Sequence, residues 1–405
     1  MINLDFTKLK ETLDRIISVH NANSVDCIVY KEHEMIFRYF SGLSDVENNK
    51  EMNGNELYLI FSMTKMLTCT AALQLWEKGK YELSDYVSKY LPEFSEMKIS
   101  SRELGSGNAS NITTGNSVGE ALDDISDGYA LNQITVKDLF TMGAGLDYDL
   151  QDYALTQAIA DGKKTTRELV GAMSEKILGF EPGTRFRYSL CHDVIGALVE
   201  IWSGQTLGEY MREHIFNPLE MKNTFFGVPK DKTLFDKMSA RYIYDENRNL
   251  KRLPLECPYN LSERYESGGA GLTSCTEDYA LFLDALACGG VSKNGNRILK
   301  PQTVKLMRTN HLNKKQLEDF YDIRPGYGYG LGVRTHINKE ISGSLSSLGE
   351  FGWDGAAGAF SMVDSDNKLS LTYFQHIHNW KLEIQNEIRN ALYEDMKLTT
   401  TKNGE

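Results

Sequence analysis

Ser62 of this 405-residue chain is followed three positions later by a lysine, a spacing that can make a serine nucleophilic. The segment reads Ser62-Met63-Thr64-Lys65. A serine hydroxyl is a poor nucleophile until a neighbouring group takes its proton. Residues i and i+3 share one face of a helix, so Lys65 can reach the Ser62 hydroxyl if the segment opens a helix. Burial would lower the pKa of this lysine and make it a usable base.

The S-x-x-K spacing is weak evidence by itself, because two other segments of the chain also match it. These are Ser95 to Lys98 and Ser365 to Lys368. Only Ser62 follows an extended apolar run, residues 57–61, and opens a helical pattern, so only Ser62 is expected to be held rigidly. Without further evidence, a serine that merely caps a helix fits the spacing equally well.

A second candidate element is Tyr188-Ser189-Leu190, which follows a Pro-Gly turn at residues 182–183. A tyrosine on such a turn can point into a cleft. If it were deprotonated beside a lysine, its phenolate would be a competent general base. The alternative is an amphipathic residue at the edge of a domain.

A third candidate element is the glycine-rich segment 352–358, which reads GWDGAAG and lies between two expected strands. Glycines in strands often mark close approach of a ligand or of another backbone. The N–H groups of an edge strand can stabilise a developing oxyanion. The alternative is a bulged strand with small residues for packing.

The elements that must position these residues are strands at both ends of the chain and helices between them. Strands are expected at 24–30, 35–40, 327–335, 357–363 and 368–375, and helices at 63–78, within 135–219 and at 382–396. This order predicts an α+β fold in which an antiparallel sheet is built from both chain termini. The expected division is a sheet domain of residues 1–80 plus 240–405 and an inserted, mainly helical domain of residues 81–239. The Gly/Ser/Asn-rich segment 100–130 is expected to be a flexible loop, either a lid or a tolerated insertion.

Composition narrows the class of protein further. The net charge of -12 argues against a nucleic-acid partner. The six cysteines include no C-x-x-C pair, so free and mostly buried thiols are expected. The N-terminus lacks the apolar run of a signal peptide, and no stretch reaches the roughly 18 apolar residues of a membrane span, so a cytoplasmic protein is expected. His376 and His378 lack further ligands at useful spacing and are expected to be structural.

In order and spacing, the three elements resemble those of the serine β-lactamase and penicillin-binding-protein superfamily, on its class C and family VIII carboxylesterase side. Other segments agree, and the resemblance extends over roughly residues 20 to 380. The further matching segments are LSD at 83–85, YLPEF at 90–94, ITVKDL at 134–139 with the following Gly145-Leu146, PLEM at 218–221, SGGAGL at 267–272, and 326–332.

The resemblance implies roles for individual residues. Ser62 would be the acylated nucleophile, Lys65 its partner, and Tyr188 the residue that acts with the lysine as general base and then as acid for the leaving group. The backbone N–H groups of Ser62 and Ala356 would form the oxyanion hole. The implied substrate-binding residues are Ser189, Leu190, Trp353, Asp354 and Gly355. No metal and no cofactor is implied.

Two departures from the family pattern bear on the substrate. Leu190 stands where β-lactamases and D,D-peptidases usually have an amide-recognising asparagine. Trp353 stands where they usually have a lysine that recognises the substrate carboxylate, and losing such a charge-assisted bond costs roughly 1.5–3 kcal/mol. At both positions the residues of this chain instead resemble those of the family VIII carboxylesterases. Asp354 is unusual even there, and it would repel anionic substrates or pair with an amine.

These observations favour an esterase of small acyl esters with weak or no β-lactamase activity. One alternative is a β-lactamase or a D-amino-acid peptidase or amidase, with Asp354 holding a free amine. Another is a non-catalytic penicillin-binding sensor. The expected partner is a small-molecule ester, amide or β-lactam, and the sequence leaves the oligomeric state open.

Overall fold

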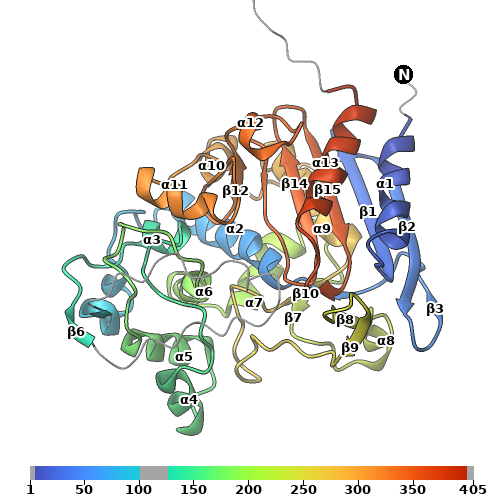
Figure 1. Ribbon diagram of the computed structural model, residues 1–405. Helices are drawn as coiled ribbons and strands as arrows, with labels where there is room; N and C mark the ends of the chain where they lie inside the picture. Colours follow the sequence, from blue (N-terminus) through green and yellow to red (C-terminus); the bar gives the residue numbers. More distant parts are fainter. Residues whose placement is uncertain (1–4, 101–125, 399–405) are drawn as a thin grey trace, which may run out of the picture.

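An eight-stranded antiparallel sheet, assembled from both ends of the chain, forms the framework of the protein (Figure 1). The computed structural model describes residues 5–100 and 126–398. The strand order is β11-β12-β13-β14-β15-β1-β2-β3, and the central pairing of β1 with β15 joins the two halves. The predicted α+β class and the sheet built from both termini are confirmed. The strands are β1 (Ser24–Lys31), β2 (Glu34–Asp45), β3 (Lys50–Glu51), β11 (Tyr327–Tyr329), β12 (Arg334–His336), β13 (Phe351–Gly352), β14 (Phe360–Asp364) and β15 (Leu369–Phe374).

Helices cover both faces of the sheet, which explains why strands β14 and β15 are buried throughout. Helices α1 (Thr7–Ser18) and α13 (Glu383–Asp395) pack together on one face, in a core that they share with strands β14 and β15. Helix α9 (Thr276–Ala287) covers the other face and contacts β1, β14 and β15. Every residue of β15 is buried, as expected for a strand with apolar cover on both sides.

The helical part of the protein lies beside the sheet and is centred on α2 (Thr64–Glu77) and α6 (Cys191–Ser203), which pack against each other (Figure 1). Helix α2 is buried on all sides from Thr64 to Leu75, so it forms the core of this part of the molecule. The remaining helices are α3 (Val136–Phe140), α4 (Tyr153–Ala160), α5 (Thr166–Ala172), α7 (Leu207–Met211), α8 (Lys232–Phe235), α10 (Pro301–Met307), α11 (Lys314–Tyr321) and α12 (Lys339–Ser342).

Local sequence explains where several of these helices begin. Helices α3, α5 and α7 each start with a capping box, in which a threonine side chain and a carboxylate three residues later exchange hydrogen bonds with backbone N–H groups. Thr135 and Asp138 form the box of α3. They lie in segment 134–139, one of the segments that carry the family resemblance, so part of that sequence pattern reflects helix initiation.

Three small sheets complete the described structure. They are β4 (Tyr58–Leu59) with β10 (Leu272–Ser274) and β7 (Phe225–Phe226); β16 (Ile377–His378) with β8 (Arg241–Tyr244) and β9 (Leu250–Leu253); and β5 (Lys98–Ser100) with β6 (Ser126–Tyr129). Residues 101–125, most of the segment predicted to be a flexible loop, lie outside the described residues. The predicted division into domains at residues 80 and 240 stays a prediction.

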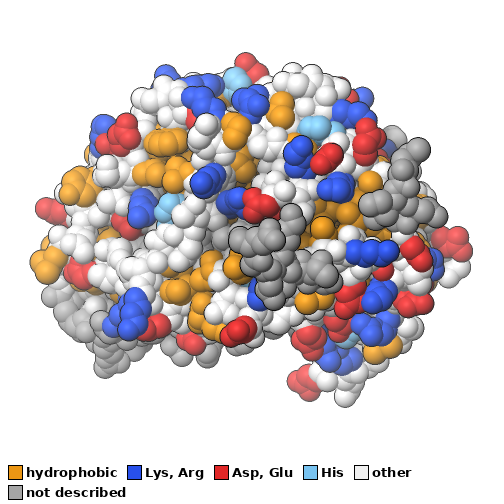
Figure 2. Space-filling view, turned by 90° about the horizontal axis from the view of Figure 1, so that it is seen from above, with side chains coloured by type: hydrophobic (Ala, Val, Ile, Leu, Met, Phe, Trp, Pro, Cys, Tyr) orange, Lys and Arg blue, Asp and Glu red, His pale blue; other side chains and the backbone are white. Residues whose placement is uncertain are grey.

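Other expectations from composition can be compared with the described residues. All six cysteines are free and five are buried, as predicted. Within residues 5–100 and 126–398, no helix has both the length and the apolar character needed to cross a membrane. On the face shown in Figure 2, basic and acidic side chains are interspersed.

Candidate active site

A strained turn places Ser62 at the start of the central helix. Strand β4 leads into a 3-10 turn, Phe61–Met63, and α2 follows from Thr64. Phe61 has a φ of 44°, in the left-handed region that a bulky residue adopts only at a cost in energy. Its buried ring packs edge-on against Tyr259 and His378, with centroids 6.0 and 5.2 Å away. This packing stabilises the turn that leaves Ser62 partly exposed.

Lys65 is fully buried one helical turn after Ser62, and its amine has three polar neighbours. Lys65 Nζ lies 3.1 Å from Ser62 Oγ, 3.1 Å from the Tyr148 hydroxyl and 2.6 Å from the Gly269 carbonyl oxygen. Burial lowers the pKa of Lys65 to about 7, although the Asp193 carboxylate opposes this shift. Near neutral pH, about half of the Lys65 side chains are therefore unprotonated and able to accept the Ser62 proton.

Tyr188 lies on the other side of the same amine. Lys65 Nζ is 4.7 Å from the centroid of the Tyr188 ring, and the Trp353 indole N–H donates to the Tyr188 hydroxyl at 3.1 Å. Burial raises the pKa of Tyr188 well above its ordinary value, while hydrogen bonds with Ser62 and Trp353 oppose the rise. At neutral pH Tyr188 is thus a phenol, and the phenolate base considered from the sequence is not the resting state. Of the two groups, only the Lys65 amine has a pKa that leaves it partly unprotonated near neutral pH.

The third candidate element forms a tight hairpin against the nucleophile turn. The Gly355 N–H donates to the Ala359 carbonyl at 2.7 Å, and Asp354 bridges to Phe360. A Cβ added to Gly355 would lie 2.7 Å from the Ile60 carbonyl oxygen, so only glycine allows this approach. The hairpin therefore lies against the residue that precedes Phe61. Ala356 follows directly after this contact, and the place of its N–H in an oxyanion hole stays a prediction.

Asp354 does not occupy the position that the sequence suggested for it. Its carboxylate is buried and pairs with Arg324 at 2.6 Å and Arg334 at 3.1 Å. Burial alone would raise the pKa of Asp354, but the two guanidinium groups outweigh it and the pKa is lowered. The carboxylate is therefore already paired inside the protein, and it is not free to hold a substrate amine or to repel an anionic substrate.

Ser189 and Leu190 are also turned inward. The Ser189 hydroxyl is fully buried and lies 3.0 Å from the Cys191 sulfur. Leu190 is buried at the start of α6, and its N–H donates to the Asp147 carbonyl at 3.0 Å. Neither side chain is placed to contact a substrate directly, because helix α6 starts here and draws both into the core.

The structure adds Tyr148, a residue that the sequence did not single out. Besides its hydrogen bond with Lys65, its ring stacks on Tyr188 with centroids 5.5 Å apart. Tyr259 packs edge-on against Tyr148 at 5.7 Å and so connects this ring to Phe61. Tyr148 comes two residues after the Gly145-Leu146 pair noticed in the sequence, but its spacing alone did not distinguish it from other tyrosines.

The glycine-rich segment that follows Ser267 forms the floor beneath Lys65. A Cβ on Gly269 would lie 2.4 Å from the Asp193 carboxylate and 3.1 Å from the Tyr148 hydroxyl. A Cβ on Gly268 would lie 2.4 Å from the His192 carbonyl oxygen. The two glycines therefore allow the backbone to pass between α2 and α6 and present the Gly269 carbonyl to Lys65.

Asp193 is held beside this floor by two hydroxyl groups. Ser267 donates to its carboxylate at 2.6 Å and Tyr265 at 2.9 Å. Burial raises the pKa of Asp193, while the Ser267 hydrogen bond and the charge of Lys65 oppose the rise. Among the charges that raise the pKa of Lys65, that of Asp193 has the largest effect, so Asp193 acts on the lysine electrostatically.

The two histidines expected to be structural are buried next to the nucleophile turn. His376 Nδ1 lies 3.0 Å from the Ser239 carbonyl oxygen, and both imidazole rings pack near Phe61. Burial lowers the pKa of each to about 3, so both stay neutral at physiological pH. Their observed contacts are those of packing residues.

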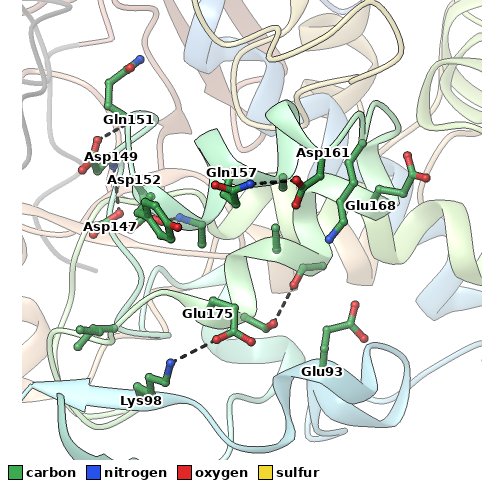
Figure 3. A pocket seen from close by; sticks show the side chains of 18 of the residues that line it. Glu93, Lys98, Asp147, Asp149, Gln151, Asp152, Gln157, Asp161, Glu168 and Glu175 are labelled. Carbon is green, nitrogen blue, oxygen red and sulfur yellow. Dashed lines mark hydrogen bonds and ion pairs between the residues drawn. The ribbon is translucent and has the colours of Figure 1, made fainter. Parts of the chain in front are cut away.

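A cleft of about 1240 Å³ adjoins the site beside α4 and α5 (Figure 3). Ser62, Lys65 and Tyr188 are not among the residues that line it, although Asp147, next to Tyr148, is. Figure 3 shows Lys98 paired with Glu175, and Gln157 donating to Asp161. The cleft is rich in carboxylates, and the nucleophile does not line it.

The fold and this arrangement, a buried lysine beside a serine at the start of a helix, define the class of serine hydrolases. The chain belongs to the Beta-lactamase family, whose model matches residues 13–393.

Among curated proteins, Protein Rv1367c of Mycobacterium tuberculosis (strain ATCC 25618 / H37Rv) is 28% identical over 346 residues, spanning 83% of this chain and 81% of that protein. Esterase EstB of Burkholderia gladioli is 24% identical over 378 residues, spanning 90% and 88% respectively. Among solved structures, EstCE1, described as a hydrolase with promiscuous acyltransferase activity, superposes with a TM-score of 0.76 at 22% identity, over 96% of this chain and 98% of that one. At that identity the structural likeness shows the fold alone.

Proposed function

We propose that the protein is an esterase that cleaves small, uncharged acyl esters through an acyl-enzyme on Ser62. The observation that carries this proposal is the hydrogen bond from the Trp353 indole to the Tyr188 hydroxyl. Trp353 stands where the resemblance places a carboxylate-binding lysine, and here it supplies an uncharged donor and an apolar ring. A substrate that needs a cation for recognition therefore finds none at this position, whereas a neutral ester needs none.

In the first half of the reaction, the Ser62 oxygen attacks the ester carbonyl carbon while Lys65 takes the hydroxyl proton. The carbonyl oxygen becomes an oxyanion, which accepts hydrogen bonds from the N–H groups of Ser62 and Ala356. When the bond to the alcohol breaks, the Tyr188 hydroxyl gives its proton to the leaving oxygen and recovers one from Lys65. The products are a free alcohol and an acyl ester on Ser62.

In the second half, water attacks the acyl carbon and gives a proton to the neutral Lys65 amine. The bond from the acyl carbon to the Ser62 oxygen breaks, and that oxygen is reprotonated through Tyr188. The carboxylic acid leaves and the enzyme is restored. In this scheme Tyr148 and Gly269 hold the Lys65 amine beside Ser62 in both halves, because their oxygens occupy its other hydrogen-bonding positions.

The test is the hydrolysis of p-nitrophenyl acetate by the wild type and by Ser62→Ala. A burst of p-nitrophenol equal to the enzyme concentration, followed by slower turnover, is expected for the wild type and not for the variant. Ser365→Ala, which alters another S-x-x-K serine far along the sequence, is the matched control and should behave as the wild type. Hydrolysis that persists in Ser62→Ala would refute the assignment of the nucleophile.

Two other activities are separated by the choice of substrate. A β-lactamase or D-amino-acid amidase would hydrolyse cephalosporins or D-amino-acid amides faster than neutral esters. A penicillin-binding sensor would be acylated on Ser62 without turnover. Both are less favoured by the site, because Trp353 replaces the cation and the Asp354 carboxylate is already paired with two arginines.

Transfer of the acyl group to an alcohol other than water is a second candidate activity. The observation that favours it is the burial of Lys65 and Tyr188, which limits the water around the reacting groups. Addition of a primary alcohol to the p-nitrophenyl acetate assay tests it. Acyl transfer predicts a new ester in the product mixture, whereas strict hydrolysis predicts acetate alone.

A further inference from the structure

A small cavity lined by three arginines lies behind the hairpin that carries Trp353 and Asp354. Its volume is about 260 Å³, and Arg324, Arg334 and Arg389 contribute to its wall. The cavity is bordered by the end of α12 and by the first residues of α13. It is referred to below as the arginine pocket.

The buried charges around the arginine pocket do not balance. Arg334 pairs with Glu350 and with Asp354, both at 3.1 Å. Arg324 pairs with Asp354 at 2.6 Å, and Arg389 Nε is 3.6 Å from the same Glu350 carboxylate that faces Arg334. Three guanidinium groups thus share two carboxylates, which leaves one positive charge in excess. A buried charge without a partner is unfavourable, so this arrangement is suited to a further anion.

Hydrogen-bond donors around the arginine pocket also lack acceptors. Among the described residues, the Nε atoms of Arg324, Arg334 and Arg389 have no hydrogen-bond partner, nor do the Gln385 side-chain amide nitrogen and the Tyr327 hydroxyl. The Arg389 Nη atoms reach only neutral amide oxygens, at 3.2 and 3.5 Å. Arg334 and Arg389 are 0% and 2% exposed, so water does not freely satisfy them. Buried donors are normally paired, and five of the unpaired ones among the described residues belong to side chains that line this one cavity.

The start of helix α13 adds to the positive potential. The 13-residue helix begins after Leu382 with no side-chain cap, and its first-turn residues line the arginine pocket. The N–H groups of Ile384 and Gln385 are bonded to the carbonyls of Lys381 and Leu382, so what favours an anion at this end is the helix dipole. The acid at this end is Glu383, which is exposed at the mouth of the cavity.

We propose that the arginine pocket binds a small dianion of the phosphate type. Guanidinium groups pair with the oxygens of phosphate in two-point contacts, and three of them converge here. The volume admits inorganic phosphate or the phosphate group of a small ester, which share this chemistry. Because Arg324 and Arg334 also hold Asp354, an anion in the pocket competes with that carboxylate. The anion would thereby act on the hairpin that positions Trp353.

Isothermal titration with inorganic phosphate, at an ionic strength held constant with chloride, tests the proposal directly. We expect saturable binding with a dissociation constant on the order of 1 mM or tighter. Arg389→Gln should weaken binding at least tenfold. Arg308→Gln, which removes an arginine that pairs with Asp366 outside the pocket, should leave it unchanged. No saturable binding, or equal binding by wild type and Arg389→Gln, would overturn the proposal.

A second variant guards against the case in which Arg389→Gln fails to fold. Glu383→Gln removes a negative charge from the mouth and should tighten phosphate binding about two- to fivefold. Misfolding cannot produce such a gain. Glu387→Gln, one turn further along α13 and paired with Arg15, is the matched control and should show no change. An unchanged affinity in Glu383→Gln would count against the site.

A final arm identifies the source of the dianion. Titration with glycerol 3-phosphate should give tighter binding than inorganic phosphate if the ligand is a phosphate ester, and weaker binding if it is the free ion. These measurements follow binding and need no enzymatic activity. The esterase proposal and the arginine pocket can therefore fail independently.

Discussion

Replacing the Asp193 carboxylate with an amide should move the pH dependence of catalysis to lower pH. Lys65 must be unprotonated to take the Ser62 proton, so kcat/KM should rise with pH through the Lys65 pKa of about 7 and then level off. Asp193 opposes the depression of this pKa, because its negative charge favours the ammonium form. In Asp193→Asn that opposition is lost and the Lys65 pKa should fall.

The size of the shift follows from the position of Asp193. A nearby opposite charge changes a pKa by about 1 to 3 units, and the hydrogen bonds from Ser267 and Tyr265 already spread the Asp193 charge, so about one unit is expected. One unit corresponds to about 1.4 kcal/mol. At pH 6, about a tenth of the wild-type Lys65 is neutral, against about half in the variant. Relative to its own plateau, the variant should thus be about fivefold more active at pH 6.

The assay is kcat/KM for p-nitrophenyl acetate between pH 5 and 9, with each profile scaled to its own plateau. Scaling matters because an amide can accept fewer hydrogen bonds from Ser267 and Tyr265, and this lowers the plateau itself. Asp278→Asn removes another buried carboxylate, one that is not among the groups acting on Lys65, and should leave the midpoint unchanged. A midpoint that stays at the wild-type value in Asp193→Asn, or that rises, would refute the reasoning.

Three further predictions concern the hairpin, the floor of the site and stability. Trp353→Phe keeps an aromatic ring but removes the N–H group that donates to the Tyr188 hydroxyl. The loss of one hydrogen bond, worth about 1.4 kcal/mol, should lower kcat for esters about tenfold. An unchanged kcat would contradict this prediction. Gly269→Ala should reduce kcat at least 100-fold, since its Cβ would lie 2.4 Å from the Asp193 carboxylate, whereas Gly128→Ala, with nothing within 4 Å, should be silent. Burial raises the pKa of Glu200 to about 7, so its contribution to stability is lost as pH rises from its ordinary value through 7. Glu200→Gln cannot ionise and should therefore be more stable than the wild type at pH 8, by about 1–2 kcal/mol in the free energy of unfolding after allowance for partial exposure, but not at pH 4. The measurement is Tm at both pH values, and an equal rise at both would point to another cause.

The spacing of residues along the chain was enough to predict the main parts of the fold and three side chains that the structure brings close together. Apolar runs at both ends indicated one antiparallel sheet, and the pairing of β1 with β15 confirms it. The structure brings Ser62, Lys65 and Tyr188 together, as expected if all three take part in one reaction. Strands of two residues, such as β3 and β13, carry too little pattern to be predicted from sequence.

The parts that could not be predicted depend on contacts between distant segments. Tyr148 meets Lys65 across 83 positions, and the Gly269 carbonyl does so across 204. The partners of Asp354 come from strand and loop positions 20 and 30 residues earlier, and nothing in their spacing marks them. Ser189 was expected to face the substrate because it belongs to the tyrosine motif. The start of α6 instead turns its side chain into the core.

The assignment of the acyl group to Ser62 is tested most directly by intact mass spectrometry of enzyme quenched during turnover of p-nitrophenyl acetate. The wild type is predicted to carry one acetyl group, and peptide mapping should place it on the segment that contains Ser62 and Lys65. Ser62→Ala should carry none, while Ser365→Ala should be labelled as the wild type is. An acetyl group that persists in Ser62→Ala, or ester turnover by that variant at the wild-type rate, would contradict the mechanism.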